Sequence, residues 1–144
     1  MTALFQITLG TLLLLVCTVQ HVFITSGIIR RLRHHIAQRT VVSPRGNFLL
    51  TVAVMVMFLA SHTLHLYLWA AALWLLGALP DFQASIYFSL VTYSTVGYGD
   101  VTLAEDFRIF GAMASVTGIL LFGVTTAFLV GFFTHLMREA ESHD

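Results

Sequence analysis

Three apolar runs, each long enough to cross a bilayer as a helix, constrain this chain more than any other feature. They cover residues 3–29, 48–79 and 104–137, and a helix needs about 20 residues to cross the hydrocarbon. Of the 144 residues, 58% are hydrophobic and only 10% are charged. A soluble domain is nearer 45–50% apolar and about 25% charged, and so short a chain has too little interior to bury the excess. The sequence therefore predicts a membrane protein.

The arginines gather between the first two runs. Five of the seven lie between Arg30 and Arg45, and the chain has no lysine. Arginine-rich short loops stay on the cytoplasmic side, so we expect residues 30–46 to form a cytoplasmic loop and the N-terminus to lie outside. Nucleic-acid binding is not expected, because the cluster is short and lies between apolar runs. Arg30, Arg31 and Arg33 lack the every-third spacing of a voltage sensor.

The first run is too long for a signal peptide and has no basic segment before it, so we expect a retained helix. The second run has a polar middle, Ser61 to His65. Dividing it there would leave pieces too short to span, which favours one long helix. His62 and His65 then lie at membrane depth, where polar groups usually face protein. A packing hydrogen bond, for instance to Thr63 or a backbone carbonyl, is the favoured interpretation; a metal or proton site is the alternative.

Pro80-Asp81 predicts a stop followed by a helix start. The apolar segment 82–93 that follows is too short to span and suits a re-entrant helix. The fold class predicted is an all-α membrane protein, with three spanning helices, a short re-entrant helix and the loop that follows it. Three crossings place the polar tail, residues 138–144, in the cytoplasm. The glycines Gly10, Gly27 and Gly77 are expected to allow close helix approach or to mark helix ends.

The most informative motif follows the short helix: Thr95-Val96-Gly97-Tyr98-Gly99, then Asp100. An ordinary strand points successive carbonyls to opposite sides. A stack of oxygens around a dehydrated cation needs them on one side, which requires left-handed residues, and Gly97 and Gly99 adopt that conformation at little cost. We expect Val96 and Tyr98 to point away from the axis and wedge the loop against surrounding helices. One copy supplies only part of a ring, so several chains must surround one axis.

With these residues, the stretch from Leu66 to Phe133 resembles the pore module of potassium channels, and this resemblance covers roughly half of the chain. It implies an outer helix, a pore helix, a filter and an inner helix assembled as a homotetramer. It also implies potassium ions held at Thr95, Val96, Gly97 and Tyr98, with K⁺ as the permeant ion and no other cofactor.

The resemblance extends into the last run. Gly118 takes the position of the hinge glycine of the family's inner helix. Four further residues fall on one helical stripe and by resemblance line the cavity and the inner gate: Ile119, Phe122, Thr126 and Val130.

One departure from the family concerns the support of the filter. Some bacterial members have a glutamate in the pore helix that pairs with the aspartate after the filter, and here Val91 takes that position. Asp100 therefore lacks that partner. Tyr87 is the residue that could hydrogen-bond Asp100 instead.

The sequence thus predicts a potassium-selective channel subunit, not an enzyme, with its partners limited to its own copies, lipid and K⁺. Its segments are a first helix and basic loop (1–46), a pore module (47–137) and a cytoplasmic tail (138–144), in the plasma or inner membrane. Three alternatives stay open: a less selective cation channel, a non-conducting accessory subunit and a histidine-based metal transporter. The gating stimulus and the role of the first helix are not predicted.

Overall fold

The computed structural model describes residues 1–38 and 44–141, and in that part of the chain it contains helices and no strands. The long helices are α1 (Ala3–Gln38), α2 (Pro44–Leu75) and α4 (Arg108–Glu141). A short helix α3 (Phe82–Tyr93) and a 3₁₀ turn η1 (Glu105–Phe107) lie between α2 and α4. All three long helices have the length and hydropathy of membrane-spanning segments, so the predicted all-α membrane fold is confirmed.

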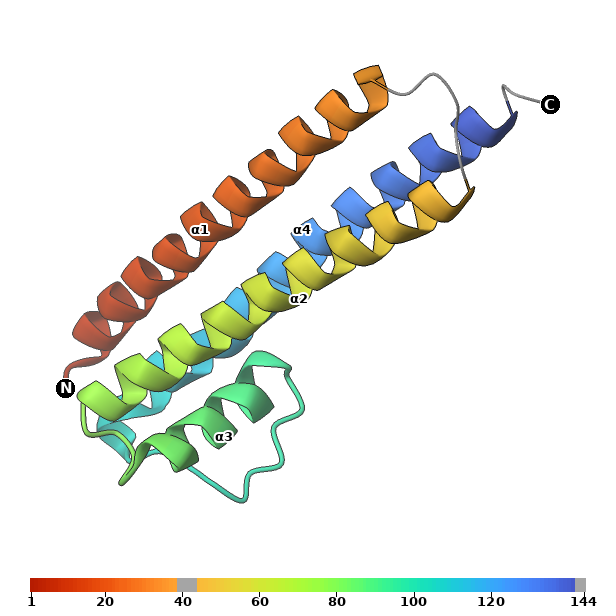
Figure 1. The fold of residues 1–144 in the computed structure, drawn as a ribbon. Helices are drawn as coiled ribbons and strands as arrows, with labels where there is room; N and C mark the ends of the chain where they lie inside the picture. The colour runs from red at the N-terminus through yellow and green to blue at the C-terminus, as the bar shows by residue number, and fades with distance from the viewer. Residues whose placement is uncertain (39–43, 142–144) are drawn as a thin grey trace.

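The long helices lie side by side, and α3 packs near one end of them against α2 and α4 (Figure 1). The N-terminus lies at the same end as α3 and the loop that follows it. The end of α1, the start of α2 and the end of α4 lie together at the opposite end. The short helix and its loop therefore lie at one end of the bundle.

Helix α2 runs without interruption through the polar residues at its middle, as predicted. It contains no proline or glycine between Asn47 and Leu75, so nothing in the backbone forces a break. Pro44 occupies its first position, where the missing amide hydrogen costs nothing. Gly77, with φ of 68°, lies just beyond its end, as expected of a glycine that marks a helix end.

The predicted loop over residues 30–46 was wrong at both ends. Helix α1 continues to Gln38 and α2 begins at Pro44. The segment after Ile29 is made of residues that tolerate a helix in water and has no glycine or proline before Pro44, so the helix extends beyond the apolar run. Residues 39–43 and the side chain of Arg33 lie outside the described part. The tail predicted from 138 is likewise helical as far as Glu141.

Helix α3 has the bounds that the sequence predicts. Asp81 is its N-cap, and its Oδ1 accepts a hydrogen bond from the Ala84 amide at 2.8 Å. This contact satisfies one of the free amides at the helix start. The C-terminal end of α3 leads directly into the Thr95–Gly99 loop.

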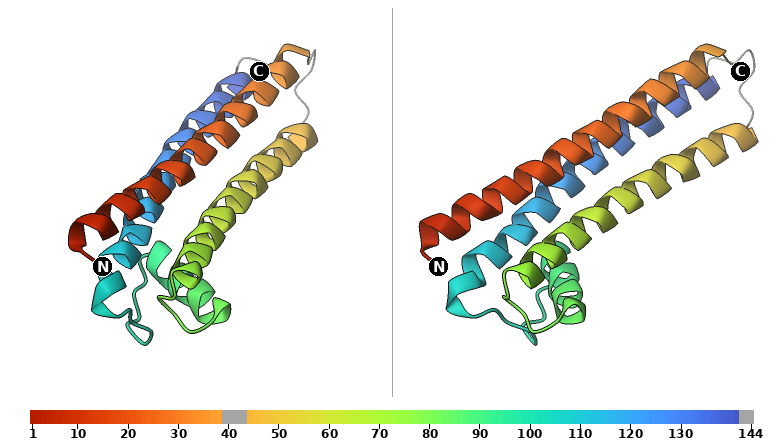
Figure 2. Two further views of the ribbon diagram at one scale, coloured as in Figure 1. Left: turned by 90° about the vertical axis from the view of Figure 1, so that its left-hand side faces the viewer. Right: turned by 60° about the vertical axis from the view of Figure 1, so that its left-hand side comes forward.

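Helix α1 packs chiefly along α4, and the two lie adjacent in both views of Figure 2. A close approach near its start is possible because Gly10 faces Met113 of α4. Further along, Cys17 is fully buried in a cluster that includes Trp69 and Phe110. The first helix is thus part of the same packed unit as α2 and α4.

Candidate functional site

The Thr95–Gly99 loop is anchored to the C-terminal turn of α3. The backbone amide of Thr95 donates to the Thr92 carbonyl at 3.0 Å, and the amide of Gly97 donates to the Val91 carbonyl at 3.1 Å. From α4, the Ser115 hydroxyl also donates to the Thr92 carbonyl, at 2.9 Å. Carbonyls at a helix end have no partner within the helix, so these contacts both satisfy them and fix where the loop begins.

Left-handed and ordinary conformations alternate along the loop. The φ angles of Thr95, Gly97 and Gly99 are 63°, 60° and 76°, whereas Val96 and Tyr98 keep negative φ. Reversing the hand of every second residue turns successive carbonyls toward the same side, unlike in a strand. Gly97 and Gly99 thus adopt the left-handed conformation that the sequence led us to expect.

Thr95 was not expected to be left-handed. A β-branched residue at positive φ is an outlier, and such a conformation costs about 1–3 kcal/mol. Its bonded amide, together with that of Gly97, holds the strained turn in place. No pattern in the sequence signals this conformation, because threonine normally disfavours it.

The two side chains between the left-handed positions are uncovered within the single chain. Val96 is 53% exposed and Tyr98 is 73% exposed. The helices of this chain therefore do not form the wedge expected around them. Any protein surface that packs on these two side chains has to come from another chain.

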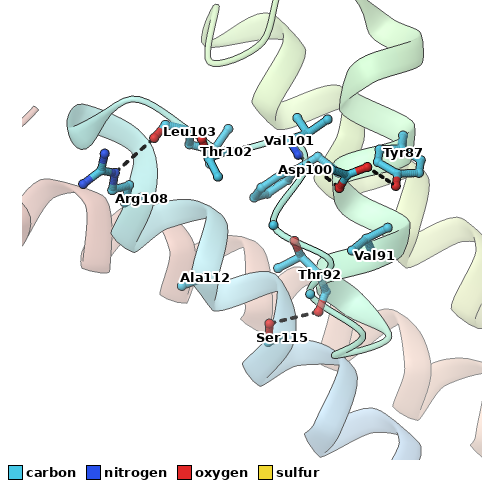
Figure 3. Close-up of a pocket in the computed structure, with 13 residues that line it drawn as sticks. Tyr87, Val91, Thr92, Asp100, Val101, Thr102, Leu103, Arg108, Ala112 and Ser115 are labelled. Atoms are coloured by element: carbon cyan, nitrogen blue, oxygen red, sulfur yellow. Dashed lines mark hydrogen bonds between the residues drawn. The ribbon is translucent and has the colours of Figure 1, made fainter.

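Asp100 is held by Tyr87, the contact that the sequence led us to expect. The Tyr87 hydroxyl donates to Asp100 Oδ2 at 2.5 Å, and the amide of Val101 donates to Oδ1 at 3.1 Å. The hydrogen bond from Tyr87 holds the pKa of Asp100 below its ordinary 3.8, because it stabilises the ionised carboxylate. Val91 is almost fully buried and lies near this pair (Figure 3).

A cavity of about 340 Å³ lies between α3, the loop and the start of α4 (Figure 3). Its lining includes Tyr87, Val91 and Asp100 on one side and Ala112 and Ser115 of α4 on the other. The cavity is therefore immediately beside the loop, on the side where Gly97 and Gly99 contribute to its wall.

The stripe predicted on the last helix is exposed in this single chain. Ile119 is 60% exposed, Phe122 40% and Val130 62%, and Thr126 is also exposed. Gly118, by contrast, is buried, and a β-carbon built on it would lie 2.0 Å from the Tyr93 carbonyl oxygen. The resemblance assigns this glycine to a hinge; the structure shows that it also allows α4 to touch the end of α3.

The paired histidines of α2 pack by hydrogen bonds, as favoured, but with other partners than those suggested. His62 and His65 both contact the Tyr93 hydroxyl, at 2.9 and 3.1 Å. Thr63 instead donates to the Leu59 carbonyl of its own helix. The structure also brings in His21 of α1, which the sequence did not single out because a lone histidine gives no signal of its partner.

The histidines do not support the metal-site alternative. Among the residues whose side chains are described, no group of three or more histidine, cysteine, aspartate or glutamate side chains is arranged to hold a metal ion. Five of the six nitrogens of His21, His62 and His65 instead face hydroxyl groups.

Comparison with known proteins gives a family match over most of the segment from α2 to α4. Residues 48–135 match the family described as "Ion channel". The potassium voltage-gated channel protein shk-1 of Caenorhabditis elegans is 37% identical over 57 residues, which are 39% of this chain. This chain spans only about a tenth of the length of that relative, 11%. No solved structure matches the chain.

Proposed function

Since this chain belongs to the ion-channel family, and within it to the group that has the potassium-channel pore module, we propose that it is one subunit of a potassium-selective channel. Potassium ions would lose their water, bind to the carbonyl oxygens of Thr95, Val96, Gly97 and Tyr98, and move by displacement between adjacent sites. No other cofactor is required for passive permeation.

The alternating backbone of the loop carries this proposal. Thr95, Gly97 and Gly99 are left-handed, and this alternation would turn successive carbonyls toward one side. Such an arrangement suits a dehydrated monovalent cation, which needs several oxygens at once to replace its hydration shell. The C-terminal end of α3 leads into this loop, and the partial negative charge of a helix C-terminus favours a cation there.

Four copies around one axis would complete the filter. One loop supplies one side of a ring, and identical subunits close most simply with cyclic symmetry. Neighbouring subunits would cover the exposed Val96 and Tyr98 and the cavity beside the loop, whose lining is mainly apolar. The same assembly would turn the exposed stripe of α4 toward the central cavity.

The inner helix would form the gate. Ile119, Phe122, Thr126 and Val130 share one face of α4 and are exposed in the single chain, which suits residues that line a water-filled cavity. Gly118 precedes all four along α4, one turn before Phe122, and lies at the contact with α3. Bending at Gly118 would therefore move this stripe relative to the filter.

The filter end of the bundle would face the outside and the arginine-bearing end the cytoplasm. Arg30, Arg31 and Arg45 lie at the end opposite the filter, and short arginine-rich connections stay cytoplasmic. Anionic lipids of the inner leaflet would add a favourable contact there.

The test is potassium and sodium flux into liposomes that contain the purified chain. Gly97→Ala is expected to abolish potassium-selective flux, because alanine is strained at φ of 60°. Gly77→Ala is the matched control: it carries the same strain at φ of 68°, but beyond α2 and outside the filter. Its flux should stay selective.

Each alternative predicts a different result. Equal potassium and sodium flux would indicate a less selective cation channel. A folded protein that does not assemble with itself and carries no flux would indicate an accessory subunit. Flux of transition metals that His62→Ala plus His65→Ala removes would indicate a histidine-based transporter.

A further inference from the structure

Six polar side chains, contributed by all four helices, are joined end to end inside the bundle. The order along the chain of contacts is Ser61, His21, Thr125, His62, Tyr93 and His65. All six have most of their surface covered by protein, and five of them are buried. The cluster lies in the middle of the long apolar helices, where an unsatisfied polar group is costly.

The first half of this series of hydrogen bonds connects α1 to α4. His21 Nδ1 lies 3.1 Å from the Ser61 hydroxyl, and His21 Nε2 lies 3.2 Å from the Thr125 hydroxyl. Thr125 Oγ1 also lies 2.9 Å from His62 Nε2. A hydroxyl can donate once and accept at the same time, so Thr125 can bond both histidines together.

The second half of the series of hydrogen bonds connects α2 to the end of α3. His62 Nδ1 lies 2.9 Å from the Tyr93 hydroxyl, and His65 Nδ1 lies 3.1 Å from the same oxygen. His62 and His21 therefore use both ring nitrogens, whereas His65 uses only Nδ1. Its Nε2 has no hydrogen-bond partner among the described residues.

Neutral histidines make these contacts depend on one another. Each neutral ring offers one donor and one acceptor, so when the Thr125 hydroxyl donates to one histidine and accepts from the other, the bonds through His21, Thr125 and His62 all run in one direction. Hydrogen bonds joined in series polarise one another, so each bond strengthens its neighbours. Loss of one member therefore weakens contacts that lie on other helices.

Tyr93 is the member of the hydrogen-bonded series that lies next to the Thr95–Gly99 loop. It is the last residue of α3 and lies two positions before the strained Thr95. Its carbonyl faces Gly118, and its ring packs on Phe122 with centroids 5.5 Å apart. Fixing its hydroxyl thus fixes the end of the helix from which the loop starts.

We infer that His62 and His65 are positioning residues for the filter, acting through the Tyr93 hydroxyl, and that α1 takes part through His21 and Thr125. This assigns a role to the first helix: through His21, it bonds and orients the hydrogen-bonded side chains of the other helices. The inference rests on the proposed function, because its main readout is the selectivity of permeation.

The first comparison is Tyr93→Phe against Tyr67→Phe. Tyr93→Phe keeps the ring and its packing but removes the shared hydroxyl, whereas Tyr67 is a half-exposed tyrosine of α2 and serves as the matched control. In liposomes, Tyr93→Phe should lower the potassium-to-sodium permeability ratio by about tenfold, the effect of roughly 1.4 kcal/mol between the two ions. Tyr67→Phe should keep the wild-type ratio.

A second comparison separates the positioning of the Tyr93 hydroxyl from the overall stability of the protein. Asparagine places a polar group near the Nδ1 position of histidine but not near Nε2. His65→Asn should therefore restore the ratio that His65→Ala loses, because His65 uses only Nδ1. His62→Asn should restore it only in part, because the contact to Thr125 stays broken.

A third comparison tests the participation of α1. Thr125→Val keeps the shape of the side chain and removes the hydroxyl between His21 and His62, so it should also lower the ratio. Thr134→Val, elsewhere on α4, removes a hydroxyl that donates to the Val130 carbonyl of its own helix, and should not. If Thr125→Val keeps the wild-type ratio, the part assigned to α1 is wrong.

A readout that does not depend on flux accompanies these measurements. Binding of K⁺ to an intact filter should raise the thermal stability of the wild-type assembly relative to Na⁺, and this difference should shrink in His65→Ala and return in His65→Asn. A wild type that conducts both ions equally would overturn the proposed function before any variant is compared. A selective wild type whose ratio survives Tyr93→Phe and His65→Ala would overturn the positioning role alone.

Discussion

Gly118 and Tyr93 are in direct contact: a β-carbon on Gly118 would lie 2.0 Å from the Tyr93 carbonyl oxygen and 3.0 Å from its carbonyl carbon. Both atoms belong to the backbone, so neither can move aside as a flexible side chain could. Helix α4 can touch the end of α3 only because this position has no side chain. The contact places the expected hinge of α4 directly against the last residue of α3, two positions before Thr95.

Gly118→Ala is therefore expected to destabilise the protein, although alanine normally favours a helix. Overpacking of this kind costs about 1–3 kcal/mol. Gly123→Ala, five residues further along the same helix, meets nothing within 4 Å and should stabilise by about 0.5–1 kcal/mol. Thermal unfolding of both variants in detergent, followed by circular dichroism, measures the difference. Equal stabilities would mean that α4 shifts away from α3 without cost.

Tyr87→Phe is expected to change how Asp100 titrates. The Tyr87 hydrogen bond holds the pKa of Asp100 below its ordinary 3.8 in the folded protein. The contact is therefore fully present above pH 3.8 and is lost as the pH falls through the lowered folded pKa. Tyr87→Phe should return the pKa of Asp100 toward 3.8. Titration of a ¹³C-labelled aspartate carboxylate in nanodiscs follows the shift.

Tyr67→Phe serves as the control for this titration, because it removes a hydroxyl from another half-exposed tyrosine far along the chain from Asp100. It should leave the Asp100 titration unchanged. An Asp100 pKa that stays low in Tyr87→Phe would attribute the shift to the Val101 amide, which also donates to this carboxylate.

Helix α3 was predictable to the residue, and the long helices were not. Asp81 gives a start signal that depends only on local geometry, and the helix ends at Tyr93, just before the Thr95–Gly99 motif. The ends of α1 and α4 lie outside the apolar runs, since a helix continues into water wherever its residues permit. Hydropathy therefore located the membrane segments but not the full helices.

The contacts of the candidate site also include some that were predictable from the sequence and others that were not. The contact of Tyr87 with Asp100 was predictable because both residues lie beside a recognisable motif. The partnership of His21 with Thr125 required the packing of α1 on α4, which no local pattern contains. The left-handed Thr95 was hidden for the opposite reason: its local preference contradicts the conformation that the surrounding hydrogen bonds impose.

Asp81→Ala should loosen the start of the pore helix. The Asp81 carboxylate accepts from the Ala84 amide at 2.8 Å, and loss of an N-cap typically costs about 1 kcal/mol. Asp81→Asn should keep the cap, because asparagine serves equally well at this position. Hydrogen exchange of the first amides of α3 distinguishes them: faster exchange is expected in Asp81→Ala only. Equal exchange in both variants would show that the carboxylate contact contributes nothing to the helix start.

The last prediction concerns the docking of α1. A β-carbon on Gly10 would lie 2.4 Å from the sulfur of Met113 on α4, so Gly10→Val should force the helices apart there, at about 1–3 kcal/mol. Gly27→Val, with nothing within 4 Å, is the control for the intrinsic cost of valine in this helix. Because the obstacle is a side chain, Met113→Ala should relieve Gly10→Val. A double-mutant cycle on unfolding free energies therefore should give a favourable coupling between the two substitutions, and a coupling of zero would mean that α1 does not rest on Met113.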